Sequence, residues 1–248
     1  MRDVLDVHTH TLASGHAYNT IWEMARSAKE KGLALLGITD HAPEMPGSSH
    51  EFYFSNLKSV PRMLEGITVL QGAELNIMDY SGSVDLPQQI LRELDVVIAS
   101  LHTPCITPGT REENTGAYIA AMKNPYINII GHPDDGRYEI DYERLVAAAK
   151  ETGVLLEINN SSLNPAGLRQ NTAPNDRLML KLCKEQQVPV ILGSDAHVAS
   201  DIGRHERAVR LLEELDFPEE LVANRSVEAL MQHINYGKRD TISMEEKR

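Results

Sequence analysis

Several features that mark other classes of protein are scarce in this chain of 248 residues. Its only two cysteines, Cys105 and Cys183, are too few for a disulfide framework and fit a reducing compartment. Its apolar runs, such as Leu33–Ile38, fall far short of the ~20 residues that a membrane span requires. The N-terminus also lacks the charged and then apolar pattern of a signal peptide. We therefore expect a cytoplasmic protein without a membrane partner.

Basic side chains are in the minority, with 24 Lys and Arg against 36 Asp and Glu and a formal net charge of −12. No run of Lys or Arg supplies the basic surface that duplex binding needs, so nucleic acid is not the expected partner. Walker, GxSxG and GxGxxG motifs are also missing, which removes support for P-loop NTP hydrolysis, serine acyl transfer and dinucleotide binding. The oligomeric state is left open.

Short apolar, β-branched runs recur along the chain and alternate with helix-like stretches, of which 18–31, 141–152 and 176–187 are the clearest. This alternation predicts a parallel sheet with helical crossovers, either doubly wound or closed into a barrel. Because no Pro/Gly/Ser-rich linker interrupts the series, we favour one barrel-like domain over 1–248. We expect added helices from about Phe217 and a frayed end at Met244–Arg248. The predicted strands are Val4–Val7, Ala34–Thr39, Ile67–Glu74, Leu94–Ser100, Ile127–Ile130, Val154–Ile158 and Val188–Gly193.

Histidine is plentiful, with ten in the chain, and its placement is not random. Most of the histidines stand where a predicted strand ends, which in parallel α/β folds is the edge where functional groups gather. His8 and His10 are two residues apart on a strand and so project from the same face. His16 follows in the next loop. Together with two carboxylates at the same edge, the set is His8, His10, His16, His41, Glu74, His102, His132, Asp195 and His197.

Imidazole and carboxylate together suit divalent zinc, manganese or iron. Nine ligands exceed the three or four that one catalytic metal takes from a protein, so the number indicates two or three ions. Glu74 has two carboxylate oxygens and is the natural bridge between two metals that clamp a water. Such a water is deprotonated near neutral pH and becomes a nucleophile, while the remaining charge stabilises a leaving oxygen.

These segments resemble the PHP (polymerase and histidinol phosphatase) superfamily of metal-dependent phosphoesterases, closest to its stand-alone YcdX-like phosphatase branch. The resemblance covers nearly the whole chain. It implies a distorted seven-stranded βα (TIM-like) barrel with a trinuclear metal centre, usually zinc and sometimes manganese or iron. The motifs that carry it are His8-Thr-His10-Thr, Ser14-Gly-His16-Ala-Tyr18, Ile38-Thr-Asp40-His41, Gly72-Ala-Glu74, His102, Gly131-His132-Pro133, Leu156-Glu157-Ile-Asn159-Asn160-Ser161 and Gly193-Ser-Asp195-Ala-His197.

The resemblance also implies which ligands share a metal, and every ligand position is filled. One metal would be held by His8, His10, Glu74 and Asp195, a second by Glu74, His102 and His132, and a third by His16, His41 and His197.

Other polar residues are candidates for supporting roles. Asp40, Glu74 and Asp195 are the expected catalytic carboxylates. Asp40 would orient His41 or accept a proton, with a simple hydrogen bond at the strand end as the alternative. Glu157 and Asn159 fit either a polar core contact or substrate binding. We expect Arg137, Arg204 and His205 as substrate-binding residues, with a solvated loop charge as the alternative for Arg137.

Hydrolysis of a small phosphomonoester by a metal-bridging hydroxide is the function that these residues favour, with a small phosphorylated molecule as the partner. A phosphodiesterase or 3′ exonuclease and a histidinol-phosphate phosphatase remain alternatives on the same centre, and so does a metal-binding module without turnover. Cys105 and Arg111 also have the CxxxxxR spacing of cysteine phosphatases. However, Pro108 removes one backbone N–H from that loop, which weakens this alternative.

Overall fold

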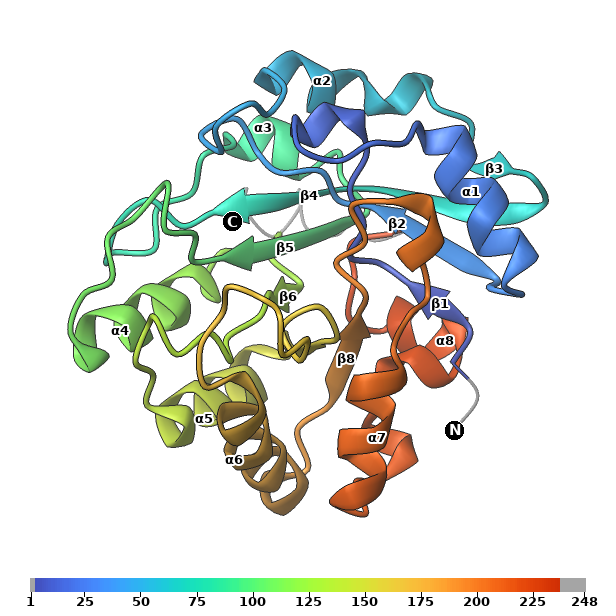
Figure 1. Ribbon diagram of the computed structural model, residues 1–248. Coiled ribbons are helices and arrows are strands. Elements are labelled where there is room, and N and C mark those ends of the chain that lie inside the picture. Colours follow the sequence, from blue (N-terminus) through green and yellow to red (C-terminus); the bar gives the residue numbers. More distant parts are fainter. Residues whose placement is uncertain (1–2, 237–248) are drawn as a thin grey trace.

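Seven parallel strands form a nearly closed barrel in the computed structural model, which describes residues 3–236 (Figure 1). The strands lie in the order β1-β2-β4-β5-β6-β7-β8, and β3 (Met63–Leu64) pairs antiparallel with β4. Glu65 and Gly66, both with positive φ, make the tight turn between β3 and β4. The parallel strands are β1 (Leu5–Asp6), β2 (Leu35–Ile38), β4 (Ile67–Asn76), β5 (Val96–Ser100), β6 (Ile129–Ile130), β7 (Leu155–Asn159) and β8 (Val190–Gly193).

The inner face of each strand changes character along its length. In β5, Val96 and Ile98 belong to the apolar interior of the barrel, whereas Ser100 at the end of the strand hydrogen-bonds to Glu74. The alternate residues, such as Val97, pack outward against the helices. Strand side chains alternate with a period of two, so the inward side chains of one apolar strand fill the barrel interior and the outward ones pack against the helices. The last inward side chain of the strand is polar and lies at the mouth of the barrel.

Asn224 completes the barrel between β8 and β1, which are joined by an isolated bridge between Thr9 and Ala196. Its side chain accepts from the backbone N–H of Leu192 (2.7 Å) and donates to the carbonyls of Leu192 (3.0 Å) and Leu5 (3.2 Å). One amide therefore substitutes for the missing ladder between the first and last strands.

Helices cover the outside of the strands (Figure 1). Capping boxes start two of them, where the side chains of Thr20 and Glu23, and of Thr110 and Glu113, satisfy the first backbone N–H groups. None of the helices within 3–236 is long and apolar enough to cross a membrane. The helices are α1 (Ile21–Glu30), α2 (Glu51–Asn56), α3 (Gln88–Leu91), α4 (Arg111–Ala121), α5 (Tyr142–Thr152), α6 (Thr172–Gln186), α7 (Glu206–Glu214) and α8 (Val227–Met231).

The seven predicted strands and the barrel are confirmed; the third strand is longer than predicted, the sixth has the predicted length, and the other five are shorter. The third predicted helix begins four residues earlier than expected, at Thr172, because Pro174 lies in its first turn, where proline is tolerated. The residues after Phe217 do more than extend the fold: Leu230 and Ile234 pack into the apolar interior of the barrel. The predicted end at Met244–Arg248 lies outside the described residues, and the single domain over 1–248 stays a prediction.

Candidate metal centre

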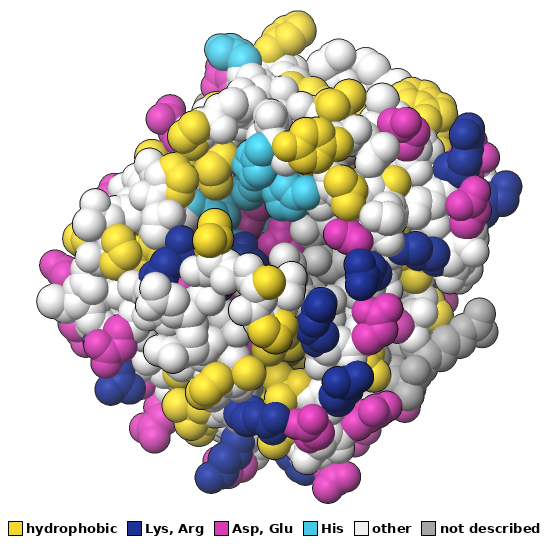
Figure 2. Space-filling model, in the orientation of Figure 1, with side chains coloured by type: hydrophobic (Ala, Val, Ile, Leu, Met, Phe, Trp, Pro, Cys, Tyr) yellow, Lys and Arg dark blue, Asp and Glu magenta, His cyan; other side chains and the backbone are white. Residues whose placement is uncertain are grey.

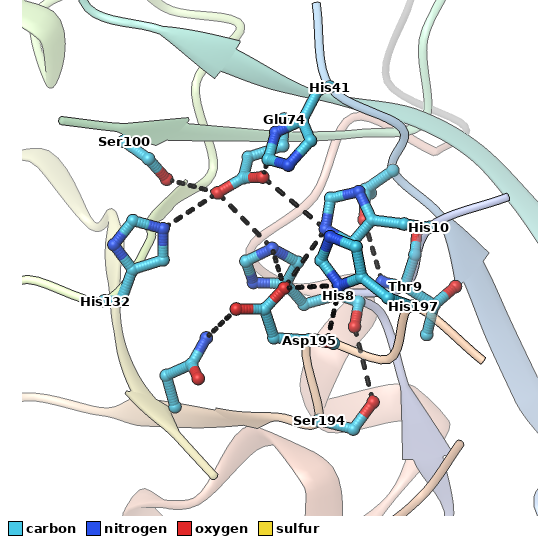
Figure 3. A network of polar contacts seen from close by, with 12 residues as sticks. His8, Thr9, His10, His41, Glu74, Ser100, His132, Ser194, Asp195 and His197 are labelled. Carbon is cyan, nitrogen blue, oxygen red and sulfur yellow. Dashed lines mark hydrogen bonds and ion pairs between the residues drawn. The ribbon is translucent and has the colours of Figure 1, made fainter. Parts of the chain in front are cut away.

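All nine predicted ligands meet at the carboxyl-terminal end of the barrel. Figure 3 labels these ligands except for His16 and His102. Glu74 is the last but two residue of β4, and the other ligands stand in the turns that follow β1, β2, β5, β6 and β8. In the space-filling view the histidines line a hollow with acidic side chains at its base (Figure 2). Since the strands hold these turns, the ligands are positioned before any ion binds.

Glu74 lies between five of the imidazoles and is completely buried. Its Oε1 atom is 3.0 Å from His132 Nε2, 3.2 Å from His102 Nε2 and 3.3 Å from His8 Nε2. Its Oε2 atom is 2.8 Å from His41 Nδ1 and 3.5 Å from His10 Nε2. Each carboxylate oxygen thus faces its own group of nitrogens, as a bridge between two ions requires.

Asp195 and the remaining histidines complete the opposite side. Asp195 Oδ1 is 3.2 Å from His10 Nε2 and 3.5 Å from His197 Nδ1. The ring of His16, which is exposed, lies 5.0 Å from that of His41 and 4.9 Å from that of His197, centroid to centroid. His16 therefore lies at the open side of the cluster.

The cluster fits divalent cations because its inward-facing atoms lack hydrogen-bond partners. His41 Nδ1 and Glu74 Oε2 are 2.8 Å apart, yet neither makes a hydrogen bond, and His8, His10 and His102 each have an unpaired Nε2. Buried polar atoms without partners are costly unless an ion or water satisfies them. Three groups have ligand atoms within 4.8 Å of one another: His8, His10 and Glu74; His41, Glu74 and His102; and His10, His41 and His197.

Two buried side chains fix the orientation of the imidazoles from behind. His8 Nδ1 donates to Glu157 Oε1 (2.6 Å), and His102 Nδ1 donates to Asn76 Oδ1 (2.7 Å). Glu157 Oε2 also accepts from the backbone N–H of His132 (2.8 Å). These bonds place a proton on Nδ1 of both rings, so Nε2 is the atom of His8 and of His102 that would bind a metal ion. Of the two expectations for Glu157, the structure shows the buried polar contact.

Asp40 contacts the candidate metal ligands through an intervening side chain, Ser14. Its carboxylate accepts from Thr11, from Tyr53 Oη (2.7 Å) and from Ser14 Oγ (2.7 Å). Since the Ser14 hydroxyl gives its one proton to Asp40, it accepts from His10 Nδ1 (3.1 Å) and from the backbone N–H of His41. Asp40 therefore contacts His41 only through Ser14, which accepts from the His41 backbone N–H, and its expected catalytic role stays a prediction.

The charges within the cluster are mutually dependent. Burial opposes the negative charge of Glu74, but His8, His102 and His41 around it hold the pKa of that carboxyl well below its usual range. Burial, together with His197 and His41, keeps the pKa of His10 well below its usual range. Glu74 is therefore an anion and His10 a neutral imidazole near pH 7, which are the forms that bind metal.

Backbone conformation is unusual at two of the ligands. His132 has φ 30° and Asp195 has φ 55°, both in the left-handed region that side-chain-bearing residues seldom adopt. Backbone hydrogen bonds hold these turns in place: Asp195 N–H donates to the His8 carbonyl (3.0 Å), and Asp135 N–H donates to the His132 carbonyl (3.3 Å). Such conformations persist where the surrounding structure imposes them, and they cluster at functional sites.

Arg169 was not predicted, although it lies beside the ligands. Its Nη1 atom donates to Asp195 Oδ2 (3.0 Å), Ser162 Oγ (3.0 Å) and Asn159 Oδ1 (3.2 Å), and its other nitrogens have no partner among the described residues. It lines a cavity of about 260 Å³ next to the cluster, together with Arg137, Ser161, Ser162, Gly167, Leu168, Asp195 and His197. A single arginine in a loop gives no sequence signal, whereas polar residues at strand ends, such as Asn76 and Ser100, do.

The three predicted substrate-binding residues have different positions. Arg137 lines the cavity of Arg169, with its guanidinium held by Asp135 (2.6 Å). Arg204 lines a neighbouring cavity and pairs with Asp201 (2.8 Å). His205 is not brought to the centre: it is buried and pairs with Asp3 and Asp6. The prediction for His205 is corrected, because these two carboxylates hold its ring beneath the barrel wall.

Cys105 does not have the properties of a phosphatase nucleophile. Burial, followed by the nearby Asp85 and Glu44, raises the pKa of its thiol to about 12, so the thiol stays protonated. Arg111 is exposed and its nearest carboxylate is that of Asp141 (3.8 Å). A cysteine phosphatase needs a thiolate next to a bound arginine, so this alternative is not supported.

Comparisons with known proteins agree with this geometry. The model of the PHP domain matches residues 6–161. The chain is 49% identical over 234 residues to a probable phosphatase of Clostridium novyi (strain NT), which covers 94% of this chain and 95% of the relative. It is 52% identical over 235 residues to a probable phosphatase of Caldanaerobacter subterraneus subsp. tengcongensis, with 94% and 92% covered.

A solved structure shares the fold. It is the histidinol phosphate phosphatase of Lactococcus lactis, complexed with zinc, L-histidinol and phosphate, with a TM-score of 0.57 and 20% identity over 87% of this chain and 95% of that chain. The sequence matches extend over nearly the full length of the relatives, and the family match includes the segments that supply the ligands from His8 to His132. The chain therefore belongs to the PHP domain family, within a group of proteins named probable phosphatases, that is, phosphoric ester hydrolases.

Proposed function

We propose that this protein hydrolyses small phosphomonoesters at a centre of three divalent cations, with zinc as the principal metal and manganese or iron as alternatives. The observation that carries the proposal is the set of nine converging ligands, among which His8, His10, His41, Glu74 and His102 each have a buried nitrogen or oxygen without a hydrogen-bond partner. When bound, divalent cations would supply a water of lowered pKa as nucleophile and positive charge for the phosphate oxygens.

The ligand sets follow the family resemblance. His8, His10, Glu74 and Asp195 would hold one ion, and Glu74, His102 and His132 a second. The third would be held by His16, His41 and His197. Glu74 would serve two ions, because its two oxygens face different groups of nitrogens. Asp40 has a positioning role through Ser14, which keeps Nε2 of His10 unprotonated.

Arg169 is the residue we propose for binding the phosphate. It uses only Nη1 for its contacts with Asp195, Ser162 and Asn159, so the other face of the guanidinium is free toward the cavity. A planar guanidinium can give two parallel hydrogen bonds to a phosphate. Its charge also offsets the carboxylate of Asp195, which lowers the electrostatic cost of bringing an anion to an acidic protein.

The test is hydrolysis of 4-nitrophenyl phosphate by protein reconstituted with zinc or manganese. We expect phosphate release that EDTA abolishes, and we expect His41→Ala to lower kcat/KM by more than about a hundredfold, since even outer partners of metal ligands cost 10–100-fold. His50→Asn is the matched control, because His50 is an exposed helix cap outside the centre. Activity that survived both EDTA and His41→Ala would refute the metal mechanism.

Substrate breadth distinguishes the remaining alternatives. A panel with histidinol phosphate, sugar phosphates, nucleotides and single-stranded DNA would separate a phosphomonoesterase from a 3′ exonuclease. We expect the small monoesters to be hydrolysed faster, because the net charge of −12 opposes the approach of a long polyanion. Full metal occupancy without hydrolysis of any ester would instead indicate a binding module.

A further inference from the structure

A second, smaller cavity adjoins the candidate metal centre. Its volume is about 100 Å³, and it shares Ser161 and Asp195 with the cavity that contains Arg169. Lys and Arg side chains lie on both sides of the hollow that holds the histidines (Figure 2). Every residue that lines the small cavity is polar: Asn160, Ser161, Asn164, Ser194, Asp195, Asp201, Arg204 and Arg207.

Arg207 brings a positive charge to this cavity that nothing nearby neutralises. It lies in the first turn of α7 and is half-buried, and its guanidinium has no hydrogen bond or ion pair among the described residues. The two carboxylates of the cavity are already paired, Asp201 with Arg204 (2.8 Å) and Asp195 with Arg169 (3.0 Å). The uncompensated charge is therefore that of Arg207.

Asn160 adds a second unused donor. Its side chain is buried, with 3% exposure, and its Oδ1 atom accepts from the backbone N–H groups of Arg207 (2.8 Å) and Ala208 (3.2 Å). Its Nδ2 atom has no partner among the described residues. A buried amide with an unused N–H donor and a half-buried guanidinium without a partner among the described residues, at one polar cavity, form an environment suited to an anion.

We propose that this cavity binds a second anionic group of the substrate, a carboxylate or a phosphate, while the phosphate ester lies at the metal centre beside Arg169. This inference rests on the proposed phosphatase function and specifies its substrate class: short phosphomonoesters whose leaving group carries another negative charge. Both cavities border Asp195, so a short molecule spans them. Arg207 is then a specificity-determining residue.

Three esters with one three-carbon chain test the proposal: 3-hydroxypropyl phosphate, 3-phosphonooxypropanoate and propane-1,3-diyl bisphosphate. We expect higher kcat/KM for the two esters that carry a second anionic group, and the better of the two identifies the preferred anion. In Arg207→Gln the ratio of kcat/KM for an ester with a second anionic group to that for the hydroxypropyl ester should fall about tenfold or more. Arg210→Gln is the control, because Arg210 lies one turn further along α7 and does not line the cavity.

Binding gives a readout that is independent of turnover. By titration calorimetry, the phosphonate 4-phosphonobutanoate should bind wild-type protein more tightly than 4-hydroxybutylphosphonate, and Arg207→Gln should remove the difference. Equal kcat/KM for all three esters, or equal effects of Arg207→Gln and Arg210→Gln, would overturn the second anion site and leave the phosphatase intact. If no ester were hydrolysed, the proposed function would fail, and the calorimetry alone would decide the anion site.

Discussion

At the scale of single residues, the metal centre depends on side chains that never reach an ion. Glu157 contacts both the ring of His8 (2.6 Å) and the backbone N–H of His132 (2.8 Å), and so couples two turns from opposite sides of the barrel. Ser14 likewise contacts both the His10 ring and the His41 backbone N–H, while its hydroxyl donates to Asp40. Such partners fix the tautomer and the direction of each imidazole, which raises the affinity of the ligand set for metal.

Replacing Glu157 with Gln tests this role. An amide in place of the carboxylate weakens the acceptor for His8 Nδ1, so we expect metal affinity to fall 10–100-fold. Metal content after dialysis against buffered zinc measures the change. Glu151→Gln, an exposed change of the same kind at the end of α5, should leave affinity unaltered. Equal losses in both variants would show that general charge, rather than the bond to His8, is responsible.

At the scale of elements, the strands leave room for these buried polar groups by carrying glycine at the level below the ligands. A Cβ atom on Gly193 of β8 would lie 1.9 Å from Glu157 Oε1, and one on Gly131, just after β6, would lie 2.2 Å from Ser100 Oγ. Neither glycine has a positive φ, so the requirement at both positions is space. The strands thus combine an apolar floor, a level with small residues and a polar mouth.

Gly193→Ala should therefore affect both stability and metal binding. We expect a loss of about 1–3 kcal/mol in the free energy of unfolding, from overpacking, together with weaker metal binding as Glu157 is displaced. Gly116→Ala in α4 is the contrasting control: its Cβ would meet nothing within 4 Å, and alanine should stabilise the helix by roughly 0.5–1 kcal/mol. Urea denaturation measures both. An unchanged free energy of unfolding in Gly193→Ala would contradict this prediction, because it would mean that β7 and β8 move apart at little cost to accommodate the methyl group.

At the scale of the whole molecule, ion pairs tie the start of the chain to its last third. His205, immediately before α7, is buried and pairs with Asp3 and Asp6 around β1. Burial opposes the charge of the ring, but Asp6 and Asp3 outweigh it and raise the pKa of His205 to about 10. The protonated imidazole therefore joins the edge of the barrel where β1 and β8 lack a regular ladder.

This pairing predicts a pH dependence of stability. Because the pKa of His205 is higher in the folded than in the unfolded protein, where it is about 6.5, its contribution is complete below that pH and is lost as pH rises through about 10. We expect the urea midpoint of wild type to fall more between pH 7 and 10 than that of His205→Gln. Parallel curves for the two proteins would contradict the assignment of charge to His205.

Much of the fold and most of the ligands could be predicted from the order of residues. The period of two in a strand and the polar residue that follows the strand are both local properties of the sequence. The histidines and acids at the strand ends, from His8 to His197, therefore indicated the mouth of a barrel although no long-range contact was known. The family resemblance added the grouping into three metal sites, which stays a proposal. Local capping signals such as Thr110 and Glu113 were also present in the sequence, although they were not used to place α4.

What only the tertiary structure decided involves residues whose roles depend on segments far apart in the chain. Arg169 reaches Asp195 because its loop folds back over the mouth, and Asn224 closes the barrel because the chain between α7 and α8 returns to β1 and β8. The same holds for Arg207 and Asn160, which meet only where α7 packs beside the turn after β7. Local periodicity specifies strand, helix and strand end, whereas the partner of a lone arginine or amide is set by chain-wide packing, which no short stretch of sequence encodes.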